Sequence, residues 1–279
     1  MIGWRFLLSR RWAGYLAIAL VFATVCVSLG CWQLARRAEA RAEIDRVATN
    51  FDADPTPLSQ ALPELDSYDE SQKWLTVSMT GTYLLDDQLL VRNRPLDGNP
   101  GFEVLTPLQL SNGDVFVVDR GWLPTGQNQD APDAVPTPPS GTVSVVVRLK
   151  AGEPHLDSRG ATEGQIATIE LPLIEQQVGE PTYTGAYGLL ATEDPAAADR
   201  PLAVAKPVPD EGPHLSYAFQ WFVFALLGFV ALGYIARQEY RLVNSDDPDE
   251  QERAAERARK RAAKRSDADI EDDILDGRG

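Results

Sequence analysis

Three side chains at the start of one apolar segment could hold a metal-bearing ring. His214 precedes Tyr217 by three residues and Trp221 by seven, so a helix would place all three on one face. A neutral imidazole beside aromatic rings at a membrane surface can serve as an axial ligand to a haem iron. It can equally serve as a polar anchor that positions the end of a helix. The spacing alone leaves both roles open for His214.

Few other residues could carry chemistry. The 279 residues include two His and two Cys, too few for a zinc ribbon, an iron–sulfur cluster or a disulfide framework. The sequence contains neither a G-x-S-x-G nucleophile elbow nor a glycine-rich phosphate loop. Its second histidine, His155, lies in a loop and has no distinctive neighbours. We therefore predict a protein without catalytic residues, which is not an enzyme.

Two charge-free segments, Ala13–Leu34 and Tyr217–Ala236, must position these residues. At about 1.5 Å per residue each reaches about 30 Å, the thickness of the hydrocarbon core of a bilayer. Aromatic side chains near both ends are typical of membrane interfaces. We predict two transmembrane helices; the alternatives are buried core helices or, for the first segment, a cleaved signal sequence. Cys26 and Cys31 fit small apolar positions of this helix better than a disulfide or a lipidation site.

Basic residues set the predicted orientation. Arg237 and Arg241 follow the second segment, whereas residues 207–216 before it contain no Lys or Arg. The positive-inside rule places both termini in the cytoplasm, and makes residues 35–216 an extracytoplasmic loop of a cell-membrane protein. This loop holds 13 Lys and Arg against 28 Asp and Glu, so it carries the whole net charge of −15. That balance argues against nucleic acid and suits either a basic partner surface or simple solubility.

The layout predicts an α+β membrane protein with two transmembrane helices and one β-rich domain, sandwich- or barrel-like. Its parts are the cytoplasmic N-terminus 1–12, the spans 13–34 and 217–236, the extracytoplasmic domain 35–216 and the charged cytoplasmic tail 237–279. Short helices are expected near Leu58–Leu62 and Leu171–Val178, and Ala35–Thr49 should extend the first span. Alternating apolar residues predict a strand at Leu75–Met79. Further strand-like runs are Gln88–Arg94, Phe102–Leu110, Val115–Arg120, Val143–Lys150, Tyr183–Ala191 and Leu202–Lys206.

Three further segments have their own signals. Asn112-Gly113 predicts a hairpin turn in which both residues adopt positive φ. The proline-rich stretch Pro124–Gly141 is expected to be a mobile excursion between strands. The tail beyond Asn244 is disordered or a lone helix, and its basic stretch Arg257–Arg265 either contacts anionic lipid or only aids solubility.

Several separated motifs resemble one family, the surfeit-locus (Surf-one) proteins of cytochrome c oxidase biogenesis. They are Leu29–Arg37 (LGCWQLARR), Gly81–Tyr83 (GTY), Val91–Pro95 (VRNRP), Pro100–Phe102 (PGF), Thr106–Leu108 (TPL), Val118–Pro124 (VDRGWLP) and His214–Trp221 (HLSYAFQW). The resemblance covers about residues 13–240. A lysine usual after the Arg pair is missing, since Ala40 stands there. The long charged tail resembles an actinobacterial extension.

The resemblance implies a haem chaperone that transiently holds or delivers haem a to the haem-bearing catalytic subunit of the oxidase. By position, His214 would ligate the haem iron, Tyr217 and Trp221 would flank the porphyrin, and Trp32, Arg36 and Arg37 would lie nearby on the first helix. Other oxidase subunits and membrane lipid are the remaining expected partners. The alternatives are a stable accessory subunit of the oxidase or respiratory supercomplex, a scaffolding role for the same helix end, and an enzyme of unrecognised chemistry.

Overall fold

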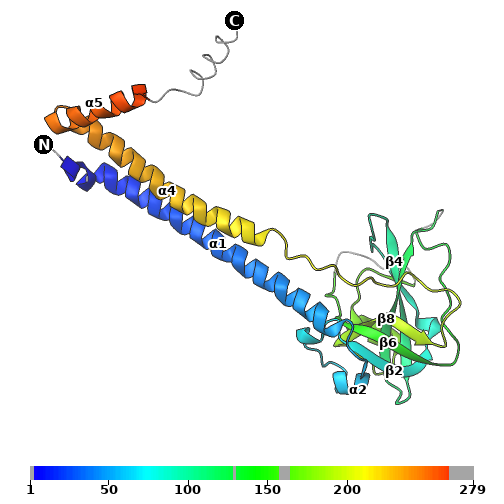
Figure 1. The fold of residues 1–279 in the computed structure, drawn as a ribbon. Helices are drawn as coiled ribbons and strands as arrows, with labels where there is room; N and C mark the ends of the chain where they lie inside the picture. The colour runs from blue at the N-terminus through cyan, green and yellow to red at the C-terminus, as the bar shows by residue number, and fades with distance from the viewer. Residues whose placement is uncertain (1–2, 128–129, 157–163, 264–279) are drawn as a thin grey trace, which may run out of the picture. The chain divides into compact units, whose positions relative to one another are not determined.

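The computed structural model describes residues 3–127, 130–156 and 164–263. The chain divides into two compact units (Figure 1). The helical unit comprises the segments up to Glu39 and from Gly212 onward, and the barrel unit comprises Ala40–Glu211. Helix α1, Arg10–Asn50, contributes residues to both units.

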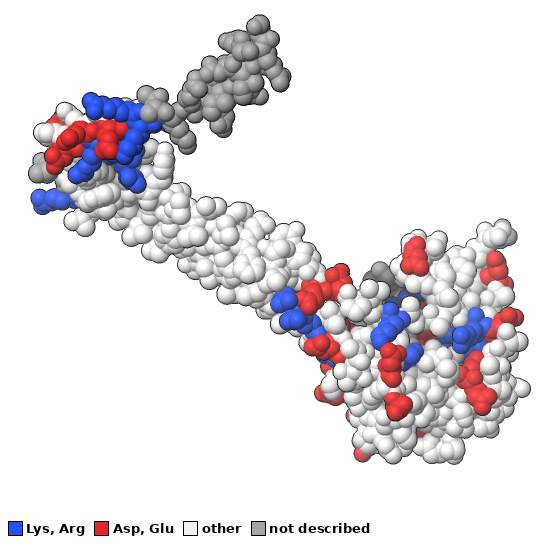
Figure 2. All heavy atoms as spheres, viewed as in Figure 1, with Lys and Arg blue, Asp and Glu red and all other residues white. Residues whose placement is uncertain are grey.

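The helical unit is built on two long helices, α1 and α4, the latter running from His214 to Val243. Both are long and apolar enough to cross a membrane, and 11% of each apolar stretch is buried. Such low burial argues against the core helix of a soluble protein. Figure 2 shows an uncharged surface along the middle of both helices. The first helix also continues without a break through residues 35–49, as predicted. These two helices fit a membrane protein.

Small residues let α1 and α4 approach closely. A Cβ atom on Gly30 would lie 2.7 Å from the ring of Phe222, and one on Gly228 would lie 3.0 Å from the ring of Phe22. Close packing of this kind at small residues is typical of helices that associate within a membrane. We call the contact surface between the helices the seam; it comprises Cys26, Gly30, Gln33, His214, Ala218, Phe222 and Ala225.

Two shorter helices complete the helical unit. The 3₁₀ helix η1, Gly3–Leu8, precedes α1. Helix α5, Pro248–Ala263, follows α4 after a short turn. The buried side chain of Asn244 joins these segments, because it accepts a hydrogen bond from the amide of Gly3 and donates one to the carbonyl of Tyr240.

The barrel unit contains a closed ring of five strands. The ring comprises β2 (Thr76–Tyr83), β6 (Thr142–Ala151), β8 (Ala186–Asp194), β5 (Val115–Pro124) and β4 (Gly101–Leu110). Neighbours are antiparallel except β5 and β8, and β4 pairs back with β2 to close the ring. Three short strands add to it: β1 (Thr56–Pro57), β3 (Leu89–Val91) and β7 (Gln165–Ile166).

Apolar residues line both faces of this sheet. One cluster, which includes Val77, Leu108, Phe116 and Val147, takes residues from all five ring strands and fills the barrel. The other packs Leu105 of β4 and neighbouring strand residues beneath the end of α1 and α3 (Leu171–Val178). The remaining short helices are α2 (Leu58–Ala61), η2 (Glu70–Gln72) and η3 (Leu85–Asp87).

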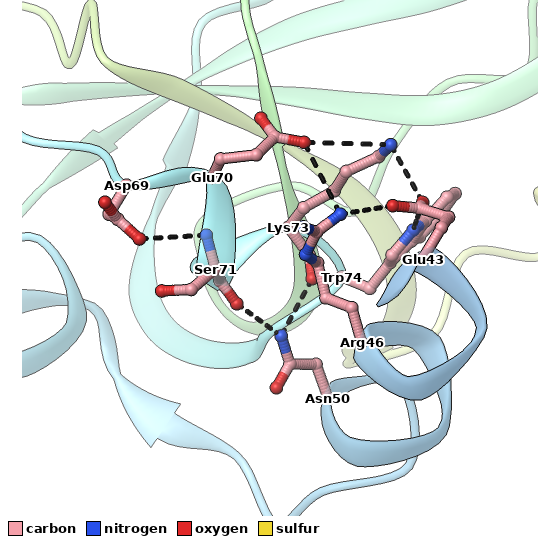
Figure 3. Close-up of polar contacts among 8 residues, drawn as sticks. All are labelled: Glu43, Arg46, Asn50, Asp69, Glu70, Ser71, Lys73 and Trp74. Carbon is pink, nitrogen blue, oxygen red and sulfur yellow. Dashed lines mark hydrogen bonds and ion pairs between the residues drawn. The ribbon is translucent and has the colours of Figure 1, made fainter. Parts of the chain in front are cut away.

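Ion pairs and hydrogen bonds fix the C-terminal end of α1 within the barrel unit. Glu43 accepts a hydrogen bond from the Trp74 indole at 3.0 Å and pairs with Lys73 at 2.8 Å and with Arg46. Burial alone would raise the pKa of Glu43, but these hydrogen bonds and cations hold it below its ordinary value. The last residue, Asn50, donates to two backbone carbonyls of the η2 segment. Figure 3 shows this network, which comprises Glu43, Arg46, Asn50, Asp69, Glu70, Ser71, Lys73 and Trp74.

The predicted fold class is confirmed: two long apolar helices flank a β-rich domain with a few short helices, and the domain is a barrel. The prediction of a strand at Leu202–Lys206 is wrong. Only Leu202 pairs, with Trp122: Pro201 before it has no amide to donate, and residues 203–206 pair with no strand. The strand expected at Gln88–Arg94 is reduced to β3, since Asn93 adopts a φ of +59°. In the β4–β5 turn only Gly113, not Asn112, has positive φ, because the loop is four residues long.

Candidate functional site

The first turn of α4 carries His214, which is bonded across the seam to α1. Its Nδ1 lies 2.8 Å from Oε1 of Gln33. An amide oxygen only accepts hydrogen bonds, so Nδ1 carries the proton and Nε2 presents its lone pair. Within the described part of the chain, Nε2 has no hydrogen-bond partner. The residue is half-buried, and its Nε2 edge lies beside Gly212, where a Cβ atom would be 3.2 Å from Nε2.

Aromatic side chains flank this imidazole on one side of the helix pair. The two helices run antiparallel, since Gln33 meets His214 whereas Arg11 meets Glu239. Each residue turns an α-helix by 100°, so the residue before a seam residue points to one side of the helix pair. In antiparallel helices this side is the same for α1 and α4. Four aromatic residues occupy such positions: Trp32, Tyr217, Trp221 and, further along α4, Phe224. Trp32 and Tyr217 are 53% and 46% exposed, so their faces are available to a flat ligand.

Two arginines follow Trp32 one turn further along α1. The Arg36 guanidinium lies 6.0 Å from the centre of the Trp32 ring and is paired with Glu39 at 2.7 Å. It is exposed, so this pair is worth little and an incoming anion can replace it. Arg37 is half-buried and already has an interaction partner. The arrangement therefore offers one readily available cation, Arg36, on the side of the aromatic residues.

These features together fit a haem-like molecule. A histidine that ligates a metal through one ring nitrogen usually donates the other N–H to an oxygen, which fixes the tautomer and the ring orientation. The bond from His214 to Gln33 is of this kind. The adjoining aromatic faces and Arg36 match the apolar macrocycle and the acidic propionates. The sequence-predicted residues thus cluster at one end of the seam, and Gln33 joins them.

Gln33 is the functional candidate that sequence reasoning missed. It is the only carboxamide within the apolar segment Ala13–Leu34. Carboxamides inside membrane segments tend to hydrogen-bond across helices, so its position was a usable signal. Its partner, however, lies 181 residues away along the chain, and only the pairing of α1 with α4 reveals it.

A separate apolar hollow lies further along the same helix pair. It has a volume of about 570 Å³, and its lining includes Tyr15, Phe22 and Gly228. Gly228 is 14 residues beyond His214, or about 21 Å along α4. The hollow and His214 therefore lie at different levels of the helix pair.

The barrel unit carries a second polar cluster. Arg94 pairs with Glu103 at 3.0 Å and with Glu153. Asp119 is fully buried and accepts a hydrogen bond from the Gly121 amide at 2.9 Å. Burial, reinforced by the nearby Glu103 carboxylate, raises the pKa of Asp119 to about 7. Its second oxygen has no hydrogen-bond partner among the described residues.

Arg120 and Gly121 have structural surroundings. Arg120 is buried in the barrel; its guanidinium donates to the carbonyl of Pro136 at 2.7 Å and lies over the Tyr83 ring. Tyr83 in turn donates to Glu193 at 3.0 Å. Gly121 has a φ of +125°, as expected of a glycine that permits a tight backbone turn.

No group of three or more His, Cys, Asp or Glu side chains capable of holding a metal occurs in the described ranges 3–127, 130–156 and 164–263. His155 lies in the barrel unit, where its Nδ1 is 2.6 Å from a Glu170 oxygen.

The fold and site define a class of protein: a β-barrel domain between two helices of membrane-spanning length, with a lone oriented histidine where the second helix begins. A family model described as "SURF1 family" matches residues 20–226 of this chain. The chain belongs to the SURF1 family.

Relatives from several organisms agree. An uncharacterized SURF1-like protein of Mycobacterium tuberculosis is 32% identical over 85% of this chain and 87% of its own length. A SURF1-like protein of Rickettsia felis is 23% identical over 75% of this chain and 91% of its own. The cytochrome oxidase assembly protein SHY1 of Saccharomyces cerevisiae is 26% identical over 45% of this chain and 32% of its own.

Proposed function

We propose that this protein assists the assembly of cytochrome c oxidase by holding haem a and delivering it to the haem-bearing catalytic subunit. Membership of the SURF1 family supports the assembly role, as does the similarity to a yeast protein named for oxidase assembly. The observation that carries the haem role is the hydrogen bond from His214 Nδ1 to Gln33, which leaves Nε2 free to ligate iron.

In this proposal the protein lies in the cell membrane with both termini in the cytoplasm. The arginines Arg5, Arg10 and Arg11 before α1, and Arg237 and Arg241 near the end of α4, support that orientation. His214 then lies at the outer membrane surface, where the barrel unit also belongs. The site would face the side of the membrane on which the barrel can meet other oxidase subunits.

Each site residue has a defined task. His214 holds the iron through Nε2, and Gln33 keeps the imidazole in the correct tautomer and orientation. Trp32, Tyr217 and Trp221 supply aromatic faces for the macrocycle, and Arg36 and Arg37 supply cations for the propionates. A haem supplies four nitrogen ligands of its own, so one histidine suffices for ligation. Ligation by one half-buried histidine is also weak enough to be reversed, as delivery requires.

The test is a reduced-minus-oxidised absorption spectrum of the detergent-purified protein from cells that make haem a. We expect a haem spectrum for the unaltered protein and its loss in His214→Ala. In Gln33→Leu the imidazole loses its orienting acceptor, so haem affinity should fall about 10- to 100-fold. Haem titration of the purified variants measures this change.

His155→Ala is the matched control, because it removes the other histidine without touching the helical unit. It should retain the spectrum. Absence of haem from the unaltered protein, or an identical spectrum in His214→Ala, would contradict the ligand role of His214. The assembly role would survive that result, because it rests on the family.

A further inference from the structure

The end of the helix pair remote from His214 forms an organised cap. Trp4 of η1 stacks on Tyr240 of α4, with ring centres 4.4 Å apart. Asn244 at the end of α4 hydrogen-bonds both to Gly3 and to its own helix. These contacts fix η1 against the last turns of α4.

Helix α5 carries one buried carboxylate, Glu250, which lines a hollow together with Trp4 and Tyr240 of the cap. The Glu250 side chain is 8% exposed, and it pairs with Arg257 and, at 3.8 Å, with Arg253. Because both arginines lie on α5 with Glu250, the pairs also support the helix at spacings of three and seven residues. Thus α5 presents one basic face toward α4.

Two adjoining hollows lie between α4, α5 and η1. The larger has a volume of about 940 Å³ and is lined by Tyr234, Gln238, Arg241, Ala254, Arg257, Ala258 and Lys260. The smaller has a volume of about 470 Å³ and is lined by Trp4, Gly233, Arg237, Tyr240, Arg241, Glu250, Arg253 and Arg257. Both include Arg241 and Arg257, so they adjoin at these two residues, and we call the two hollows together the basic cleft.

The cleft has an excess of positive charge. Five cations line it, namely Arg237, Arg241, Arg253, Arg257 and Lys260, against the single carboxylate of Glu250. Lys260 is paired outside the cleft lining with Glu256 at 2.7 Å. Arg237 and Arg241 have no ion pair with any residue in the described ranges. Two cations are therefore ready to receive an anion.

The cleft also lies at a defined depth. The charge-free segment ends at Ala236, and Arg237 follows it directly. Tyr234 and Trp4 are 64% and 51% exposed, and aromatic residues of this kind mark the headgroup level of a bilayer. An anion held here would lie where the phosphates of membrane lipids lie.

We propose that this basic cleft binds the headgroup of an anionic phospholipid, with Arg237 and Arg241 as the primary phosphate contacts. Basic pockets beside transmembrane helices bind such headgroups through clustered cations, and aromatic rings pack against the adjoining glycerol and acyl carbons. The site is independent of the haem proposal, because it uses the opposite end of the helix pair and none of the same residues.

Native mass spectrometry of the detergent-purified full chain, titrated with phosphatidylglycerol or zwitterionic phosphatidylcholine, tests this site. We expect preferential retention of phosphatidylglycerol. In the double variant Arg237→Gln/Arg241→Gln its apparent affinity should fall about 25-fold, at about fivefold for each cation removed. Circular dichroism checks that the double variant keeps its helices.

The charge-matched control is Arg10→Gln/Arg259→Gln, which removes two exposed arginines outside the cleft. It should bind phosphatidylglycerol as the unaltered chain does. An equal loss in this control would reduce the effect to general attraction and overturn the site, as would equal retention of phosphatidylcholine.

Two further measurements test whether another group binds in the cleft. Inorganic phosphate that displaces the lipid at millimolar concentration would show a free-anion site and overturn the lipid assignment. Residues 266–279 contain six Asp and Glu. If phosphatidylglycerol preference emerges only after their removal, the acidic segment occupies the cleft and the proposal is wrong for the full chain.

Discussion

Asp119 is the residue whose ionisation is most strongly tied to folding. It lies inside the barrel unit with 1% of its surface exposed and receives one backbone hydrogen bond. Burial without a cation in direct contact raises its pKa to about 7 in the folded state, whereas a solvated Asp has a pKa of about 3.9. The folded protein therefore binds more protons than the unfolded chain between these two values.

This difference predicts a stability that falls with rising pH. Between about pH 4 and about pH 7 the free energy of unfolding should decrease, by a few kcal/mol in total. In this window Asp119 stays protonated in the folded state but is ionised in the unfolded chain, so rising pH favours unfolding. Asp119→Asn keeps the acceptor for the Gly121 amide but has no proton to lose. Its advantage over the unaltered protein should grow across the same window. Denaturant unfolding followed by tryptophan fluorescence measures it.

Asp86→Asn, an exposed carboxylate in η3, serves as the control for the loss of one negative charge. It should follow the pH dependence of the unaltered protein. A constant difference between Asp119→Asn and the unaltered protein at all pH values would show that Asp119 does not titrate in this window.

Single residues of the site were only partly visible in the sequence. The spacing of His214, Tyr217 and Trp221 placed three candidates on one face, and they lie at the start of α4. The role of Gln33 and the burial of Asp119 were not predicted, because both depend on contacts between distant segments. The sequence pattern around a single carboxamide, or around an Asp in a strand, does not show whether the side chain is solvated or buried.

The backbone conformation of strand β5 depends on Gly121. This glycine has a φ of +125°, and a Cβ atom there would lie 2.5 Å from the backbone oxygen of Leu202. The segment that contains Leu202 pairs with Trp122 through two backbone hydrogen bonds. The absence of a side chain at Gly121 is thus required both by its own backbone and by the neighbouring chain.

Gly121→Ala should therefore lower the free energy of unfolding by about 3 kcal/mol or more, since strain and collision add. Gly113→Ala is the matched control: its φ is +93°, but nothing lies within 4 Å of the added Cβ. It should lose only about 1 kcal/mol, the effect of backbone strain alone. Denaturant unfolding of both variants distinguishes the two contributions; equal losses would mean that the Leu202 segment yields freely.

Elements with strong local signals were predicted best. The helix expected at Leu171–Val178 is α3 with the same bounds, and Gly179 ends it with a φ of +75°. Strands β4 and β6 begin and end within one residue of prediction. Prediction failed at Leu202–Lys206, where a mostly apolar run suggested a strand but only Leu202 pairs.

At the scale of the whole molecule, charge and apolar surface are strictly divided. The loop between the two apolar segments holds all 15 units of net negative charge. A stable accessory subunit and an assembly factor would both be compatible with this division. They differ in how long and how often the protein stays with its partner.

An assembly factor should be present well below parity with the oxidase. We expect deletion of its gene to deplete haem a from the purified oxidase, as seen in pyridine haemochrome spectra. Quantitative mass spectrometry of the purified complex should find this chain at a small fraction of the catalytic subunit. Equal stoichiometry together with unchanged haem content would instead identify a stable accessory subunit.

The sequence allowed two β architectures, a sandwich and a barrel. Period-two alternation identifies strands but not their neighbours, and both architectures bury one face of each strand. The contacts between β2 and β4, such as Gly81 with Leu110, decide for a barrel. These pairs join segments separated by other strands in the chain, which no local pattern encodes.

Closure of the barrel also prevents strand pairing between neighbouring protein molecules. Chains confined to a membrane plane meet far more often than chains free in solution, and unpaired strand edges invite aggregation by strand addition. Because β2 and β4 satisfy each other, the five principal strands offer no such edge. Outside the ring, the described chain has only the two- and three-residue strands β1, β3 and β7. The barrel can therefore crowd against other membrane complexes and separate from them again without exchanging backbone hydrogen bonds.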